Sequence, residues 1–140
     1  MHLDEKIVAE LYRNSQMGII TLEKLNDCCK DEKFKKFLIK QLQGYDEITK
    51  QINALIKDMG FKKVPITRSS KLKTRLMITM KNNHDPQTIA KMLIIGSTMG
   101  IIKLQSQLNR LKTVHPDILF LIERLLCFEE ESMKQLKKFL

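Results

Sequence analysis

The segment Ser15–Ile20 reads SQMGII, and the segment Ser97–Ile102 reads STMGII. A second pair of similar segments recurs in the same order and at nearly the same separation: FLIKQLQGYDE, from Phe37 to Glu47, and FLIERLLCFEE, from Phe120 to Glu130. Chance recurrence of Ile and Leu explains either match alone, but two matches in the same order are much harder to obtain by chance. The sequence therefore predicts one structural unit that occurs twice.

Hydrophobic spacing predicts that each unit is a pair of antiparallel helices. Apolar or small residues recur every three or four positions over residues 4–29 and again over 31–59, which is the period of a helix with one buried face. Only one or two residues separate these two helices, so they must lie antiparallel. The second helix is expected to begin near Asp31, where acidic residues suit the positive end of the helix dipole, and Gly60 is expected to end it.

Two proline residues mark the helix starts of the second unit. Asp85 is a candidate N-cap and Pro86 a first-turn residue, and His115-Pro116-Asp117 opens the last helix. The 140 residues are thus predicted to form a single all-α domain, a four-helix bundle with hairpin one over 4–59, a crossover over 60–84 and hairpin two over 85–140. The crossover contains a short amphipathic stretch, in which Leu72, Leu76 and Met80 recur at helical spacing.

The positive charge of the chain is concentrated in this crossover. The net charge is +9, and the segment 60–84 contains seven basic residues and no acidic one: Lys62, Lys63, Arg68, Lys71, Lys73, Arg75 and Lys81. These residues predict contact with an acidic partner, a nucleic-acid backbone or an anionic membrane surface, and a solvated polar face is the simpler alternative. With two Arg and only Phe61 for stacking, the segment gives no strong nucleic-acid signal.

Two longer stretches resemble a known family. They read IAKMLIIGSTMGIIKL over 89–104 and FEEESMKQLKKFL over 128–140. With them the chain resembles, over essentially its whole length, the ferritin-like superfamily, in particular small bacterial members that have no assigned function. The resemblance implies a ferritin-like four-helix bundle, and it raises the question whether the di-iron ligands of that superfamily are present.

The ligand pattern of a di-iron bundle is largely missing. Each hairpin of such a bundle supplies a Glu from its first helix and a Glu-x-x-His from its second. The corresponding positions here are Asp46-x-x-Thr49 and Glu129-x-x-Ser132 or, one residue later, Glu47-x-x-Lys50 and Glu130-x-x-Met133. Neither register has a histidine, and the histidines of the chain lie far from the middle of the bundle: His2, His84 and His115. Asp46 and Glu129 are therefore weak metal candidates, and we expect no bound metal and no cofactor.

The repeated motif has a structural interpretation. Its first-helix serines stand where metal-binding members of the resembled superfamily would place Glu. Small residues on the helix seams let helix axes approach closely, and two aromatic side chains from the opposing helices fill the remaining space. This interpretation predicts a core packed shut rather than a small-molecule pocket. The small residues are Ser15, Gly18, Ser97 and Gly100, and the aromatic residues are Tyr45 and Phe128.

The helix over 85–112 is apolar on more than one face, so it needs cover beyond its partners in the bundle. We expect the crossover to cover one side of this helix and a second subunit to cover another, together with Ile19 and Ile20 of the first helix. A homodimer is therefore predicted. The crossover residues expected to provide this cover are Leu72, Leu76, Met77 and Met80.

Several function classes are disfavoured. The longest uncharged stretch inside a helical region, Met92–Ile102, is too short to span a bilayer. The cysteines Cys28, Cys29 and Cys127 form no CxxC motif and are expected to be buried, reduced thiols. No nucleophile elbow or glycine-rich phosphate loop occurs.

We therefore predict a non-catalytic structural or interaction protein of the cytoplasm. One alternative is a metal-binding oxidoreductase or storage relative with a degenerate di-iron-type site. The other is a binder of anionic surfaces, nucleic acid or membrane, through residues 61–81.

Overall fold

A computed structural model describes residues 3–81 and 83–140 of the chain. Over these residues the protein is all-helical, with five helices and no strand, as the sequence predicted. The helices are α1 (Leu3–Cys28), α2 (Glu32–Met59), α3 (Arg68–Thr79), α4 (Pro86–Arg110) and α5 (Pro116–Lys137).

The helix ends lie close to where the capping residues placed them. The Asp31 carboxylate accepts a hydrogen bond from the backbone N–H of Phe34 at 2.8 Å, which caps the start of α2. Gly60, which follows α2, has a φ of 67°, a left-handed conformation that glycine adopts without strain. Asp85 caps α4 in the same way, with Pro86 as the first helical residue. These side chains explain locally why each helix begins or ends there.

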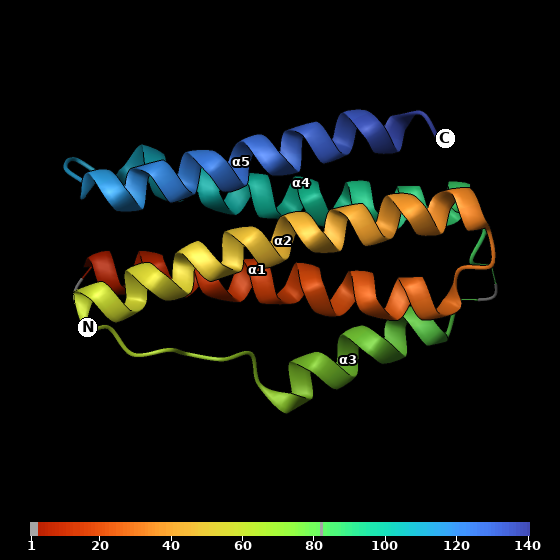
Figure 1. Cartoon of the computed structure of the whole chain (residues 1–140), viewed down its shortest axis with the longest axis horizontal. Helices are drawn as coiled ribbons and strands as arrows, with labels where there is room; N and C mark the ends of the chain where they lie inside the picture. Colours follow the sequence, from red (N-terminus) through yellow and green to blue (C-terminus); the bar gives the residue numbers. More distant parts are fainter. Residues whose placement is uncertain (1–2, 82) are drawn as a thin grey trace.

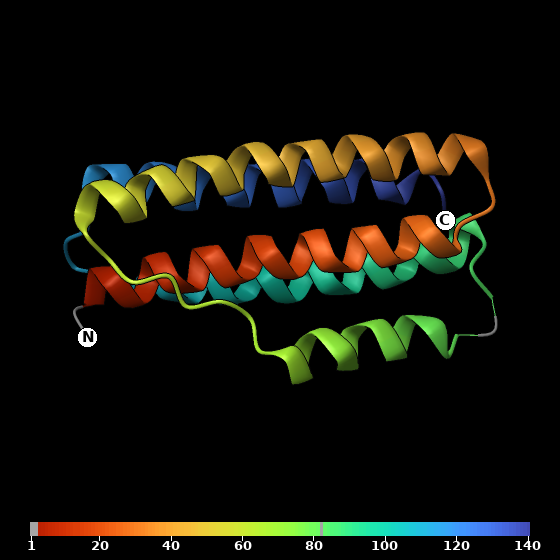
Figure 2. The same cartoon turned by 60° about the horizontal axis from the view of Figure 1, so that its bottom comes forward.

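The four long helices lie side by side in two antiparallel pairs, α1 with α2 and α4 with α5 (Figures 1 and 2). Residues 60–67 leave the end of α2 and run back alongside α1, and α3 continues in the same direction (Figure 2). As a result α4 starts at the end of the molecule opposite to the end of α2, and the two helices run in the same direction. The connection between the hairpins therefore travels the length of the long helices.

The core lies between the two helix pairs. Within it, Leu11 of α1, Ile52 of α2 and Ile122 of α5 are fully buried. Near the C-terminus the rings of Phe34 and Phe139 meet edge to face, with centroids 4.6 Å apart. Contacts within each pair are more extensive than contacts between the pairs, and those between α1 and α4 are among the sparsest.

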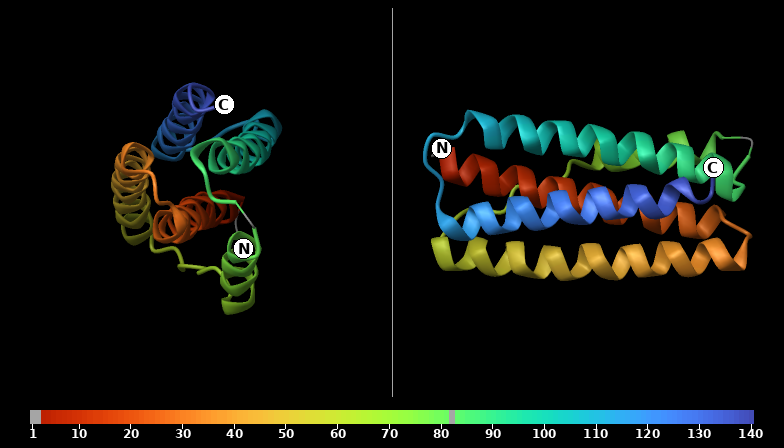
Figure 3. Two further views of the ribbon diagram at one scale, coloured as in Figure 1. Left: turned by 90° about the vertical axis from the view of Figure 1, so that its right-hand side faces the viewer. Right: turned by 90° about the horizontal axis from the view of Figure 1, so that it is seen from above.

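The crossover helix does not cover α4, contrary to the prediction. α3 packs on α1, and Ile78 is its buried residue. End-on, α3 lies outside the four long helices, next to α1 (Figure 3). The four apolar residues expected to cover α4, namely Leu72, Leu76, Met77 and Met80, are exposed instead.

The predicted dimer surface is also changed by the packing. Ile20 is buried and Ile19 packs against the core, so neither residue is presented to a partner. The exposed apolar residues of α4 are Ile95, Met99 and Ile102, which share one side of the helix. Any subunit contact along α4 would therefore use these three residues and not the α1 isoleucines.

Candidate ligand-binding cleft between α1 and α4

In the first copy of the small-residue motif, Ser15 lies in the core and Gly18 is covered by an aromatic ring. Ser15 is fully buried, and its hydroxyl donates a hydrogen bond to the backbone oxygen of Tyr12 at 2.9 Å. The ring of Tyr45, from α2, lies against the backbone of Gly18: a Cβ added to Gly18 would lie 2.5 Å from Cζ of the ring. Glycine is required at this position because the aromatic ring occupies the space of a side chain.

The second copy is not closed in this way. Phe128, which corresponds to Tyr45, packs against Gly44 of α2, where an added Cβ would lie 2.3 Å from its ring. Its ring also meets Tyr45 edge-on, with centroids 4.8 Å apart. A Cβ on Gly100 would meet only the side chain of Asn14, at 3.2 Å, and a Cβ on Gly96 would meet nothing within 4 Å. The ring of Phe128 therefore lies against Gly44 and does not cover Gly100 of the second motif.

A cleft of about 620 Å³ remains between the two motifs, lined by Gly18 of the first and by Ser97 and Gly100 of the second, so the prediction of a core packed shut is wrong. One wall is α4, including Gly96, Ser97 and Gly100, and the other is α1. On α1 the lining runs from Glu10 to Leu22, about 18 Å along the helix axis. Tyr45 and Glu129 contribute to the lining from α2 and α5, and residues 64–67 contribute from the crossover. The cleft is thus elongated and is bordered by every part of the fold.

A buried carboxyl group lies in this lining. Glu129 is only 2 % exposed, and its Oε1 accepts a hydrogen bond from the hydroxyl of Tyr45. Oε2 has no hydrogen bond of ordinary geometry within the described residues. Burial raises the pKa of Glu129, although the Tyr45 hydroxyl and the nearby Ser97 partly oppose the shift. Glu129 therefore contributes to the lining a buried carboxyl whose Oε2 lacks a hydrogen bond of ordinary geometry, in an environment that disfavours its charge.

The pKa of Tyr45 is affected by the same contact. Burial, together with the adjacent carboxyl of Glu129, raises the pKa of the Tyr45 hydroxyl well above its ordinary value. Tyr45 therefore keeps its proton and remains the hydrogen-bond donor to Glu129. Next to it, the hydroxyl of Ser132 donates to Oε1 of Gln41, so a short polar row crosses from α5 to α2.

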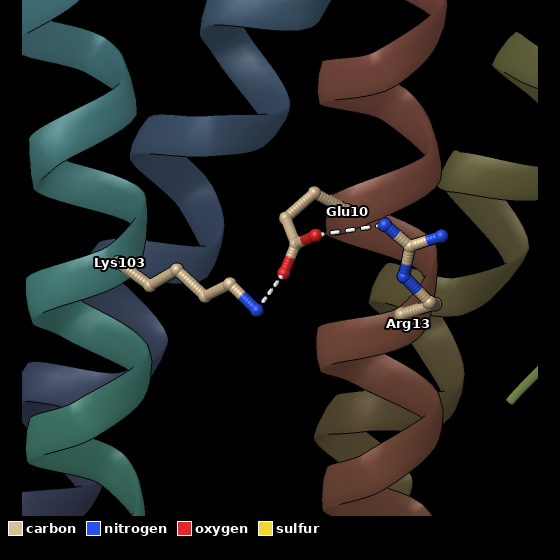
Figure 4. A network of polar contacts seen from close by, with 3 residues as sticks. All are labelled: Glu10, Arg13 and Lys103. Carbon is tan, nitrogen blue, oxygen red and sulfur yellow. Dashed lines mark hydrogen bonds and ion pairs between the residues drawn. The ribbon is translucent and has the colours of Figure 1, made fainter.

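An ion-pair network joins α1 to α4 at one part of the cleft (Figure 4). The Glu10 carboxylate forms ion pairs with Nζ of Lys103, at 2.5 Å from Oε1, and with Nη2 of Arg13, at 2.8 Å from Oε2. Burial raises the pKa of Glu10, but the hydrogen bonds from Lys103 and Arg13 outweigh it and lower the pKa overall. Sequence reasoning missed this network. Its one signal was an acidic residue among the buried apolar positions Ile7, Val8 and Leu11.

The two weak metal candidates are not brought together. Asp46 is exposed on α2, whereas Glu129 is buried. Among the residues that the structure describes, no three His, Cys, Asp or Glu side chains gather as a metal would require. His84 and His115 lie beside helix starts, and His2 lies outside the described residues. The geometry of the described part therefore offers no di-metal site.

Most of the basic crossover residues face solvent. Six of the seven are exposed, and Lys71 is half-buried. The ammonium of Lys63 lies 5.9 Å from the ring centroid of Tyr12, so this part of the crossover passes close to α1. Of the cysteines, Cys29 is buried as expected, Cys28 is half-buried, and Cys127 is exposed, which corrects the expectation of three buried thiols.

Comparison of the chain with protein-family models, with curated proteins and with solved structures finds no match. No helix within residues 3–81 and 83–140 has both the length and the apolar character needed to cross a membrane.

Proposed function

We propose that this protein is a non-catalytic helical binding protein whose cleft between α1 and α4 holds an elongated, largely apolar ligand with a hydrogen-bond donor at one end. The observation that carries the proposal is the buried carboxyl of Glu129, whose Oε2 lacks a hydrogen bond of ordinary geometry, in the lining of a cleft of about 620 Å³. Ligand sites are mostly apolar concavities with a few polar groups that fix orientation. Glu129 supplies that polar group, and Met17, Met92 and Leu93 supply apolar wall.

A ligand hydroxyl suits the carboxyl in either protonation state, because it donates to Oε2 when Glu129 is ionised and accepts from Oε2–H when Glu129 is neutral. A primary amine forms a charge-assisted hydrogen bond with the ionised form. A ligand carboxylate would gain no hydrogen bond from Glu129 when Glu129 is ionised, because the ionised carboxyl has no proton to donate. The preferred ligand class is therefore a long-chain alcohol or amine rather than a fatty acid.

Binding of three twelve-carbon probes, dodecanol, dodecylamine and dodecanoate, tests the proposal by calorimetry and thermal shift. We expect dodecanol and dodecylamine to bind and dodecanoate to bind on the order of tenfold more weakly, as for one lost polar contact. Gly96→Leu should abolish binding, because Gly96 lines the cleft and a bulky side chain there narrows it. It should not unfold the protein, since replacing a helical glycine favours the helix by about 1 kcal/mol.

Ala54→Leu is the matched control, because it adds the same side chain at an exposed α2 position outside the cleft lining. Equal binding by wild type and Gly96→Leu would reject the cleft as the site. If dodecanoate binds most tightly, the head group meets Lys103 and Arg13, and Glu129 does not select the ligand.

We further propose that the fold is ferritin-like. Four features support this: the internal repeat, two antiparallel helix pairs, a crossover along the bundle, and α4 parallel to α2 (Figure 2). An experimental structure with α4 antiparallel to α2 would contradict it. We propose that the protein is related to the small bacterial members of that superfamily. We also propose that it resides in the cytoplasm, a reducing compartment that suits its three free thiols.

A homodimer is proposed on the basis of the α4 stripe Ile95, Met99 and Ile102, which no part of the described chain covers. Light scattering during chromatography measures its molar mass. Met99→Lys should convert a dimer of this kind to a monomer, and an unchanged molar mass would place the contact elsewhere.

A further inference from the structure

α3 is held to the rest of the protein by few side chains. Ile78 is its buried residue and points toward α1. Thr74 is half-buried, and its hydroxyl donates to the backbone oxygen of Ser70 and lies 3.4 Å from Sδ of Met17. The helix therefore has a narrow inner face and a wide outer face.

The outer face is apolar. Leu72, Leu76 and Met80 recur at four-residue spacing and are 58 %, 49 % and 78 % exposed. Met77 adds a fourth exposed apolar side chain beside them. An amphipathic helix of a globular protein ordinarily turns its apolar stripe to the core, but α3 turns it to solvent. We name these four residues the outer stripe of α3.

Positive charges lie beside and within the outer stripe. At 100° per residue, Arg68 and Arg75 lie beyond its Leu72 edge, and Lys73 lies between Met80 and Met77. All three are exposed, and none makes a salt bridge within the described residues. Lys62 and Lys63 precede the helix and Lys81 follows it, and no acidic residue occurs in 60–84.

The positive charges around the outer stripe of α3 restrict which kind of partner can bind there. A second copy of this chain that docked by its own outer stripe would bring two sets of unopposed positive charges together, which is unfavourable. A nucleic acid would satisfy the charges but leave the Leu and Met side chains against phosphates, with no aromatic residue on α3 for base stacking. An anionic bilayer surface satisfies both, because apolar side chains enter the headgroup boundary while Lys and Arg meet lipid phosphates.

We propose that residues 68–81 form a membrane-surface element that docks on anionic lipid, with the outer stripe inserted at the interface and Arg68, Lys73 and Arg75 on the headgroups. Because α3 is only 12 residues long and lies outside the four long helices, it can meet a flat surface without rearrangement of the core. The inference is independent of the ligand cleft.

Co-sedimentation of the full chain with vesicles tests the proposal, using phosphatidylcholine alone and phosphatidylcholine mixed with phosphatidylglycerol. We expect binding to the mixed vesicles that weakens with added salt, and on the order of tenfold weaker binding to phosphatidylcholine alone. The charge variant Arg68→Gln/Lys73→Gln/Arg75→Gln should lose at least on the order of tenfold. The apolar variant Leu72→Ser/Leu76→Ser/Met80→Ser should also lose binding at low salt, because insertion fails.

The matched control is Lys36→Gln/Lys40→Gln/Lys50→Gln, which removes the same net charge from exposed positions of α2. It should bind mixed vesicles as the wild type does. Both α3 variants alter exposed residues, so an unchanged melting temperature will show that they fold. Loss of binding in the control as well would reject a specific role for α3. Retention by the apolar variant would reject insertion, and salt-sensitive binding to duplex DNA without vesicle binding would reject a lipid surface.

Discussion

The two helical hairpins carry nearly the same motifs but differ in how those motifs are packed. In the α1–α2 hairpin, Gly18 is covered by the ring of Tyr45, and nothing larger fits. In the α4–α5 hairpin, Gly100 has only Asn14 near it, because Phe128 packs across the bundle on Gly44. Both glycines line the same cleft, but only Gly18 has an aromatic ring against it.

The hairpins also differ in which acidic residue they bury. Asp46 and Glu129 are equivalent in the repeat, yet Asp46 is exposed and Glu129 is buried. Conversely, Tyr45 is buried whereas Phe128 is only half-buried. α5 thus presents to the core a face one residue later than α2 does. A rotation of that size, about 100° on a helix, is enough to turn a carboxyl from solvent into the core.

The largest expected effect comes from the paired glycines. Gly18→Ala should destabilise the protein by about 2 kcal/mol, because the new methyl group displaces the Tyr45 ring, and the gain in helix propensity only partly offsets this. Gly100→Ala should be neutral or stabilise by up to about 1 kcal/mol, since Asn14 can move aside. Urea unfolding measures both changes. Equal losses in the two variants would remove the contrast between the hairpins.

A smaller effect is expected at the contact between the hairpins. Tyr45→Phe removes the hydroxyl that donates to Glu129 and should cost about 1–2 kcal/mol at pH 7. The loss should shrink at acidic pH, because the variant raises the pKa of Glu129 and so penalises mainly its ionised form. Tyr12→Phe is the control and should change the unfolding free energy by less than about 0.5 kcal/mol. If the two variants lose the same amount, the Tyr45–Glu129 bond does not stabilise the fold.

The smallest effects concern the two carboxyls at the cleft, whose pKa values move in opposite directions. The raised pKa of Glu129 means that its stabilising contribution is present below its ordinary pKa of 4.5 and is lost as pH rises through the folded value. Glu129→Gln should therefore gain stability relative to wild type from acidic to neutral pH, by about 1 kcal/mol. The lowered pKa of Glu10 has the reverse consequence, a contribution present above 4.5 and lost as pH falls.

Glu10→Gln should accordingly be less stable than wild type at neutral pH by about 0.5–1 kcal/mol, a modest loss because Lys103 is largely exposed. The difference should vanish at acidic pH. Thermal unfolding of both variants between pH 3 and pH 8 checks the signs. Parallel pH profiles for Glu129→Gln and Glu10→Gln would contradict the opposite environments of the two groups.

Local chemistry made the helix boundaries predictable. Asp31, Asp85 and Gly60 satisfy or end a helix through their own side chain or backbone, so their roles do not depend on distant residues. The antiparallel pairing followed from short loops. The cleft could not be predicted, because the sequence does not indicate that the ring of Phe128 packs against Gly44 and not against Gly100.

The candidate site was predicted only in part. Ser97, Gly100 and Glu129 were singled out, but as parts of a packed core or of a weak metal pair, and they line a cleft instead. Glu10 and Lys103 were missed, since their contact joins α1 to α4, far apart in the chain.

By itself the sequence determined the helices, their ends, their pairing and the site of the positive charge, because periodicity, capping and loop length act over a few residues. Only the tertiary structure decided which face each helix buries: Glu129 inside, Asp46 outside, and the stripe of α3 toward solvent. The reason is that rotation of a helix about its axis is set by the fit of side chains from several helices at once, and a repeated sequence can settle into two different fits.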